Sequence, residues 1–226
     1  MTALLVLFTF VVFAGLDYVL SRRKGLAPVV APALVPAAAS PASAPEPVFV
    51  AGYKLPEDLH YHFGHTWARP VGADMAVIGI DDFASKLTGR AKAVKLPAPG
   101  SWIRQGAKSI RIDVDGRSTE VVSPIEGEVV EVNRDLKKEP AFATWDPYGR
   151  GWLLKVRSTG LGTNLRNLMN GRLARQWTED ASQQLQLRLM ALSGSVLQDG
   201  GAPAPDFAKH LDDDEWKRLT DLFLLA

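Results

Sequence analysis

The first 24 residues are dominated by a single apolar run. Residues 3–20 are apolar almost throughout, and Arg22, Arg23 and Lys24 follow at once, whereas no basic residue precedes the run. A helix of about 18–20 such residues spans the hydrocarbon core of a bilayer. The positive-inside rule then predicts a single-pass protein of the cell inner membrane, with the N-terminus outside and the soluble part in the cytoplasm. A cleaved signal peptide is the alternative; the missing basic n-region argues against it, although the Ala-rich residues 37–44 can mimic a cleavage site.

The next segment, residues 25–52, changes to Ala, Pro, Val and Ser. Its prolines exclude a continuous helix and favour extended conformers; they are Pro28, Pro32, Pro36, Pro41, Pro45 and Pro47. At the polyproline rise the segment reaches on the order of 80 Å. We predict a linker, and two interpretations stay open: a spacer that holds a domain off the membrane, or a disordered stretch with no selected length.

The middle of the chain alternates between apolar and polar positions, as short strands do. In residues 109–114 the apolar side chains are Ile110, Ile112 and Val114, two residues apart and therefore on one face. Asp115-Gly116 then separates this run from residues 117–122, and this pair is typical of a two-residue hairpin turn. Further strands are expected over residues 75–80, 93–96, 127–132 and 151–156, and a short helix capped by acidic residues over 81–87. The pattern predicts a mainly β sandwich or barrel.

The last third changes to helical spacing. Residues 164–192 carry apolar side chains three and four positions apart, with Gly171 and residues 178–180 as candidate breaks. We therefore place a domain with C-terminal helices at residues 53–192, followed by a loop and a terminal amphipathic helix in residues 193–226. That last helix begins at Asp212 or Asp213 and has an apolar stripe of Trp216, Leu219, Leu222 and Phe223. The stripe either packs on its own domain or docks a partner protein.

Composition removes several classes of function. The chain has 26 Lys and Arg against 25 Asp and Glu, so no net positive field favours a nucleic acid. It has no cysteine, which excludes disulfides, thiolate metal sites and a Cys nucleophile. His60 and His62 share a strand face, yet spacing ties no third ligand to them, so we predict no metal site. Asp81 and Asp82 are expected to cap a helix rather than act as an acid/base pair, and we predict no catalytic residue.

Five segments together resemble the glycine cleavage system H protein, a family of lipoyl carriers. They occur in family order over about 100 residues and comprise His65-Thr66-Trp67, residues 79–84, residues 96–100, residues 123–133 and residues 146–152. The resemblance implies a barrel-sandwich hybrid, with two small sheets around one core. The family carries its lipoyl group on a Lys seven positions before the Ser of the Ser-Pro pair. Here that position is Gly116, flanked by Asp115 and Arg117.

The resemblance therefore implies a carrier fold without its attachment point. An Arg guanidinium does not deprotonate and is no acceptor for an amide-linked cofactor. Lys108 lies about 25 Å from the turn at the rise of a strand. We expect no cofactor and a non-catalytic, non-lipoylated scaffold or accessory subunit of a membrane-associated complex, held by its N-terminal helix and by protein partners.

Two alternatives remain. The first is a lipoyl carrier of a glycine-cleavage-like or sulfur-transfer system, which requires an acylated Lys. The second is a membrane-fusion adaptor of an efflux pump, which also joins an anchor to a lipoyl-type domain. Such adaptors insert a long helical hairpin between the two halves of the domain, whereas only Asp115-Gly116 separates the strands here. The second alternative is therefore disfavoured.

Overall fold

The computed structural model describes residue 18, residues 48–193 and residues 207–225. The chain divides into two compact units, Met1–Ala44 and Pro45–Ala226. Tyr18 is helical, but the rest of the predicted membrane segment and most of the predicted linker lie outside the described residues. Within the described residues, no helix combines the length and the apolar character needed to cross a membrane.

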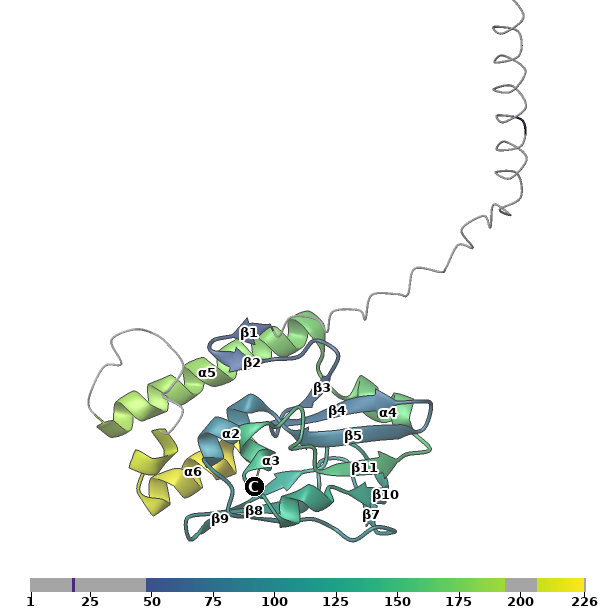
Figure 1. Cartoon of the computed structure of the whole chain (residues 1–226). Helices are drawn as coiled ribbons and strands as arrows, with labels where there is room; N and C mark the ends of the chain where they lie inside the picture. Colours follow the sequence, from purple (N-terminus) through teal and green to yellow (C-terminus); the bar gives the residue numbers. More distant parts are fainter. Residues whose placement is uncertain (1–17, 19–47, 194–206, 226) are drawn as a thin grey trace, which may run out of the picture. The chain divides into compact units, whose positions relative to one another are not determined.

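Two antiparallel sheets form the body of the second unit (Figure 1). The larger sheet has the strand order β3-β4-β5-β11-β10-β7. Its strands are β3 (His60–His62), β4 (Thr66–Val71), β5 (Met75–Ile80), β7 (Trp102–Ile103), β10 (Gly127–Val132) and β11 (Leu154–Arg157). The smaller sheet has the order β6-β8-β9, formed by β6 (Ala93–Lys95), β8 (Lys108–Val114) and β9 (Arg117–Val122). A two-stranded ribbon of β1 (Phe49–Val50) and β2 (Tyr53–Lys54) precedes them, and β1 falls within the predicted linker.

The core lies between the two sheets. Ile110, Ile112 and Val114 of β8 are all buried, as their alternation predicts, and they join Ile78 and Val156 from the larger sheet in one apolar cluster. The expectation of a mainly β domain with C-terminal helices is confirmed.

A close approach inside the larger sheet explains two of the motifs. The indole N–H of Trp67 donates to the backbone oxygen of Ile80 at 2.8 Å. A Cβ on Gly79 would lie 2.6 Å from the Trp67 ring, so only glycine fits opposite the indole. The His-x-Trp segment and the segment that begins at Gly79 therefore pack directly against each other.

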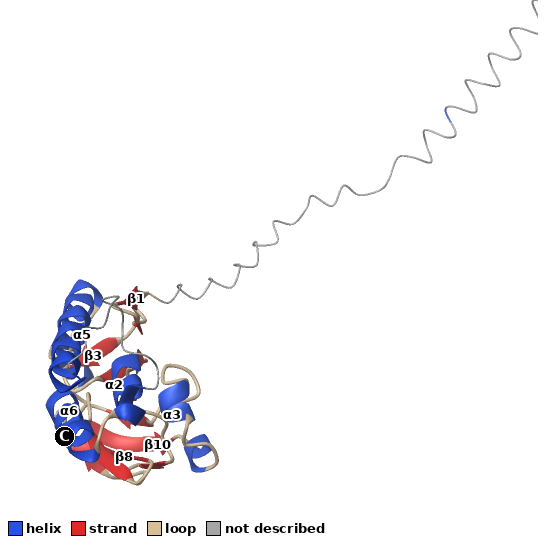
Figure 2. Ribbon diagram, turned by 90° about the vertical axis from the view of Figure 1, so that its left-hand side faces the viewer, coloured by secondary structure: helices blue, strands red, loops and turns tan. Residues whose placement is uncertain are grey.

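Helices cover the sheets on both sides. Figure 2 shows α5 and α6 along one side and α3 on the other. The α-helices are α2 (Asp82–Thr88), α3 (Phe142–Trp145), α4 (Leu161–Arg166), α5 (Gly171–Ser193) and α6 (Asp213–Leu224), and the 3₁₀ helices are η1 (Arg134–Lys137) and η2 (Phe207–His210). A new helix does begin at Gly171, but the candidate break at residues 178–180 is wrong, since α5 continues through them to Ser193. The Thr178 hydroxyl donates to the backbone oxygen of Ala174 one turn earlier, so this polar side chain is satisfied within the helix.

Candidate functional site

The β8–β9 hairpin ends in a two-residue turn, as the sequence predicts. Val114 pairs with Arg117, and the two residues between them have positive φ, 47° at Asp115 and 85° at Gly116. A Cβ placed on Gly116 would meet no atom within 4 Å. The tip therefore projects away from the domain, and it presents bare backbone at the position where the resemblance expects a lysine.

An amine from the residue just before β6 lies beside this tip. The Lys92 ammonium is 3.7 Å from a carboxylate oxygen of Asp115, and its side chain is 60% exposed. The Lys92 backbone N–H donates to the backbone oxygen of Asp113 at 2.8 Å, which continues the β6–β8 ladder by one residue. Sequence reasoning missed Lys92 because the pairing of β6 with β8 brings it there, whereas Lys108 pairs with Val122 at the far end of the hairpin.

The residue that follows the tip is tied to the C-terminal segment. The Arg117 guanidinium donates to the backbone oxygens of Leu211 at 3.3 Å and Ala208 at 3.4 Å. It also lies 5.1 Å from the centre of the Trp216 ring and 3.8 Å from a carboxylate oxygen of Asp213. Only 13% of this side chain is exposed, so Arg117 works as an anchor between the hairpin and the end of the chain.

Helix α6 lies against α2 and β9 (Figure 1). Trp216, Leu219 and Phe223 are buried in the domain, whereas Leu222 is 42% exposed. The Trp216 indole N–H donates to the backbone oxygen of Thr88 at 3.2 Å. Of the four residues proposed for partner docking, three pack on their own domain instead, because the apolar face of α6 meets an apolar surface of the same chain. Only Leu222 is left for a partner in this arrangement.

His65 and Asp81 pack and pair with each other inside the domain. His65 contacts a carboxylate oxygen of Asp81 at 2.8 Å, and its ring stacks between Phe83 and Trp177 at centroid distances of 4.0 and 4.4 Å. Asp81 also caps α2, since it accepts from the backbone N–H of Ala84. The part of the chain that the structure describes has no group of three or more metal-ligating side chains.

Burial shifts the pKa values of two histidines and one tyrosine of the domain. It lowers the pKa of His60 and of His62, and the nearby His65 lowers the pKa of His62 further. It raises the pKa of the Tyr148 hydroxyl well above its ordinary value. This hydroxyl donates to the backbone oxygen of Lys54 and accepts from the backbone N–H of Asp82, so it joins the motif of residues 146–152 to the start of α2.

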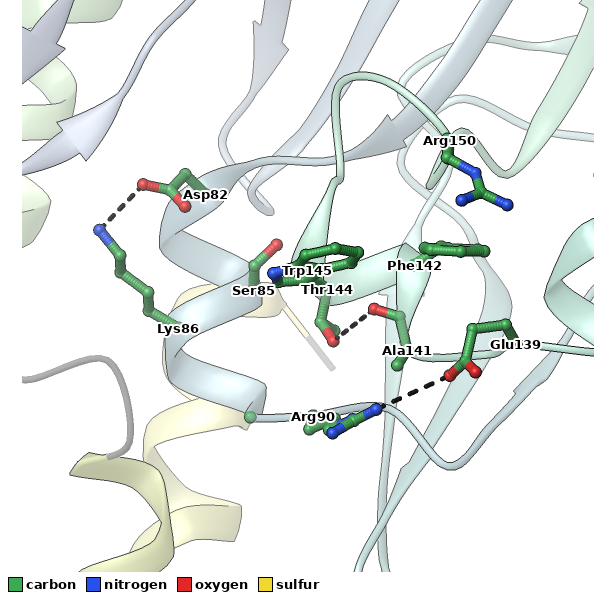
Figure 3. Close-up of a pocket in the computed structure, with 11 residues that line it drawn as sticks. Asp82, Ser85, Lys86, Arg90, Glu139, Ala141, Phe142, Thr144, Trp145 and Arg150 are labelled. Carbon is green, nitrogen blue, oxygen red and sulfur yellow. Dashed lines mark hydrogen bonds and ion pairs between the residues drawn. The ribbon is translucent and has the colours of Figure 1, made fainter.

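A pocket of about 660 Å³ lies between α2 and α3 (Figure 3). Phe142 and Trp145 give it an apolar wall, and the rings stack with centroids 6.0 Å apart. The Arg150 guanidinium lies 3.7 Å from the centre of the Phe142 ring. Two ion pairs complete the rim, Lys86 with Asp82 at 3.0 Å and Arg90 with Glu139 at 3.9 Å.

Comparison with known proteins gives one consistent family. A family model described as "Glycine cleavage H-protein" matches residues 59–181. The chain is 38% identical over 104 residues to a glycine cleavage system H protein of Alteromonas mediterranea, covering 46% of this chain and 81% of that protein. It is 41% identical over 104 residues to that of Rubrobacter xylanophilus, covering 46% and 82%, and 34% identical over 121 residues to a probable H protein of Pyrococcus abyssi, covering 54% and 90%.

Among solved structures, the chain resembles the crystal structure of a glycine cleavage system H protein from Mycobacterium marinum, with 26% identity and a TM-score of 0.46, covering 56% of this chain and 98% of that one. The family match ends at residue 181. Helix α6 and the 3₁₀ helix η2 therefore lie beyond the matched region, although they pack on the domain that the family model covers.

Proposed function

Because the chain belongs to the glycine cleavage H-protein family, we propose that it is a non-lipoylated member that serves as a non-catalytic accessory subunit of a membrane-associated complex. Members of the family are lipoyl carriers with no active site of their own, since the cofactor supplies the chemistry. A carrier needs a primary amine at the tip of its hairpin. The observation that carries the proposal is that the tip here is Asp115-Gly116, with no side chain to acylate. The tip does not fit a lipoyl group.

The surroundings of the tip support the same proposal. Arg117, the residue after Gly116, has a guanidinium in place of a primary amine and offers no acceptor for the amide. Its guanidinium is also held by two backbone oxygens of the C-terminal segment. The hairpin is thus anchored by elements outside the matched family region, an arrangement suited to a fixed structural module.

The membrane part of the proposal is supported by the sequence alone. The apolar residues 3–20 and the three basic residues after them would anchor the chain in the inner membrane, with the domain in the cytoplasm. Extraction of isolated membranes at alkaline pH tests this directly. We expect the full chain to stay in the pellet and a variant that lacks residues 1–24 to appear in the supernatant. Recovery of the full chain in the supernatant would contradict the anchor.

A lipoyl carrier is the second candidate, favoured by the family match and by one specific distance. Lys92 places an exposed ammonium 3.7 Å from Asp115 at the tip. If the attachment point has moved from the hairpin to the segment just before β6, Lys92 is the residue positioned to accept the acyl group. The amide would then join Nζ of Lys92 to the carboxyl carbon of lipoate, with the net loss of one water made of a carboxyl oxygen and two hydrogens.

Intact-mass spectrometry separates the two candidates. The full chain, K92R and G116K are purified from a lipoylation-competent host supplied with lipoate. We expect the native mass for the first two, and a gain of about 188 Da only for G116K, which returns an amine to the tip. A gain of about 188 Da in the native chain that K92R abolishes would establish the carrier function instead. A gain that persists in K92R would place the group on another lysine and would equally defeat the accessory-subunit proposal.

The accessory role itself is tested by its partners. The tagged full chain is solubilised in mild detergent, cross-linked and analysed by mass spectrometry. We expect defined cross-links from the folded domain to other proteins of one complex. A monomer that cross-links only to itself in native membranes would contradict the role.

A further inference from the structure

The pocket between α2 and α3 has the size of a small-molecule site. Its volume of about 660 Å³ lies within the usual range of such pockets, roughly 300–1,000 Å³. Trp145 lines the pocket and is 76% exposed, although tryptophan is normally among the more buried residues. Figure 3 shows the Trp145 ring beside Phe142 and facing α2. A flat apolar ligand that covered the indole would remove this surface from water.

The charges around the pocket select a ligand with one negative charge. Asp82 and Lys86 neutralise each other, as do Glu139 and Arg90. Among the residues that the structure describes, Arg150 has no carboxylate partner for its guanidinium, which stacks on Phe142 instead. Among the residues that line the pocket, one positive charge therefore remains without an ion pair, and the Asp146 carboxylate of the same loop, which does not line the pocket, accepts from the Arg150 backbone N–H instead. The planar fork of guanidinium N–H groups matches a carboxylate in bidentate geometry.

The loop that carries Arg150 is held in place before any ligand binds. The Arg150 backbone N–H donates to a carboxylate oxygen of Asp146 at 2.8 Å, and its backbone oxygen accepts from the Asn133 side chain at 2.7 Å. The next residue, Gly151, packs so tightly that a Cβ would lie 2.1 Å from the backbone oxygen of Phe142. The loop and α3 are thus one unit, and a preorganised cation binds with a smaller loss of entropy.

We propose that this pocket binds a small aromatic monocarboxylate, with the carboxylate on the Arg150 guanidinium and the ring against Trp145. The proposal goes beyond the accessory role and does not depend on it, since the pocket lies between α2 and α3 and its lining includes no residue of the β8–β9 hairpin. It gives the motif of residues 146–152 a function in addition to its packing.

The test uses 2-naphthoate as the probe and its uncharged isostere 2-naphthamide as the comparison. The full chain in detergent is titrated while the indole ¹H–¹⁵N signal of Trp145, assigned with W145F, is followed by NMR. We expect saturable binding of naphthoate that shifts this signal, and at least tenfold weaker binding of naphthamide. Equal affinity for both compounds, or saturation without any shift at Trp145, would overturn the proposal.

Variants test separately what Arg150 and the aromatic wall each contribute to ligand affinity. R150Q is expected to weaken naphthoate binding at least tenfold and to leave naphthamide binding unchanged. R134Q, at an exposed arginine of η1 outside the pocket, is the matched control and should stay within twofold of the native affinity. W145Q, at a largely exposed position where folding is not at stake, should lose both ligands. Native affinity in R150Q or in W145Q would refute the assigned contacts.

Discussion

Replacing Trp216 with alanine tests whether α6 is part of the folded domain or a free docking helix. In the structure the side chain is 1% exposed. Its indole N–H donates to the backbone oxygen of Thr88 at 3.2 Å, and the Arg117 guanidinium lies over its ring. The substitution therefore removes a large buried side chain between α6 and the rest of the domain, together with the ring contact of Arg117, whose hydrogen bonds to Leu211 and Ala208 remain.

The expected loss is large for a domain of this size. Truncation of a buried tryptophan to alanine lowers the free energy of unfolding by about 3–5 kcal/mol. Trp216→Phe keeps an aromatic ring but removes the indole hydrogen bond, so it should cost about 1–2 kcal/mol. Leu222→Ala is the control on the same helix. Because Leu222 is 42% exposed, its truncation should change the free energy of unfolding by less than about 1 kcal/mol.

Equilibrium unfolding in urea measures these differences, with far-UV circular dichroism as the probe so that the loss of a tryptophan does not alter the signal. All four proteins are compared in the same detergent at the same pH. If Trp216→Ala loses no more than Leu222→Ala, α6 does not pack on the domain. The apolar stripe would then be free for a partner, as the alternative interpretation of the sequence holds.

Three further predictions concern the backbone, a helix cap and a histidine. Gly127→Ala should lower the free energy of unfolding by more than about 3 kcal/mol, because the new Cβ would lie 2.1 Å from the backbone oxygen of Arg157. Gly162→Ala in α4 is the comparison: its Cβ would meet no atom within 4 Å, and it should stabilise the domain by up to about 1 kcal/mol. Urea midpoints in the opposite order would contradict this prediction. Asp212→Ala removes the capping box of α6 and should cost about 1 kcal/mol in the same assay, while Asp212→Asn should retain most of the stability. Burial keeps the pKa of His62 in the folded state below its value of 6.5 in the unfolded chain. Below about pH 6.5 the unfolded chain therefore binds one more proton than the folded chain, and the stability of the domain falls. His62→Gln should reduce the drop in Tm between pH 7 and pH 5, and an unchanged drop would mean that other groups cause it.

Local patterns in the sequence are sufficient for the hairpin. The alternation of Ile110, Ile112 and Val114 and the turn pair Asp115-Gly116 each depend on residues close in the chain, and the structure confirms both. The same holds for the cap of α2 by Asp81, which requires only the backbone three residues on.

Contacts between segments far apart in the chain cannot be predicted from such local patterns. An amphipathic stripe such as that of α6 shows that one face is apolar, but not whether the covering surface belongs to the same chain. Lys92 is separated from Asp115 by more than twenty residues, and only the β6–β8 pairing brings them together. The pocket likewise combines α2 with a loop some sixty residues later, so its residues have no common spacing that a sequence pattern could reveal.

The retained hairpin and the absent amine are physically compatible. Strands β8 and β9 contribute Ile110, Ile112 and Val121 to the main core, so the domain needs the hairpin in order to fold, whether or not it carries a cofactor. The tip packs against nothing, because a Cβ on Gly116 would touch no atom, but its φ of 85° still favours glycine there. The core therefore requires the two strands whether or not the tip carries a group, and the positive-φ turn itself favours Asp115-Gly116 at the tip. Because the core requires the hairpin in either case, the modification state of the tip has to be measured separately from the fold.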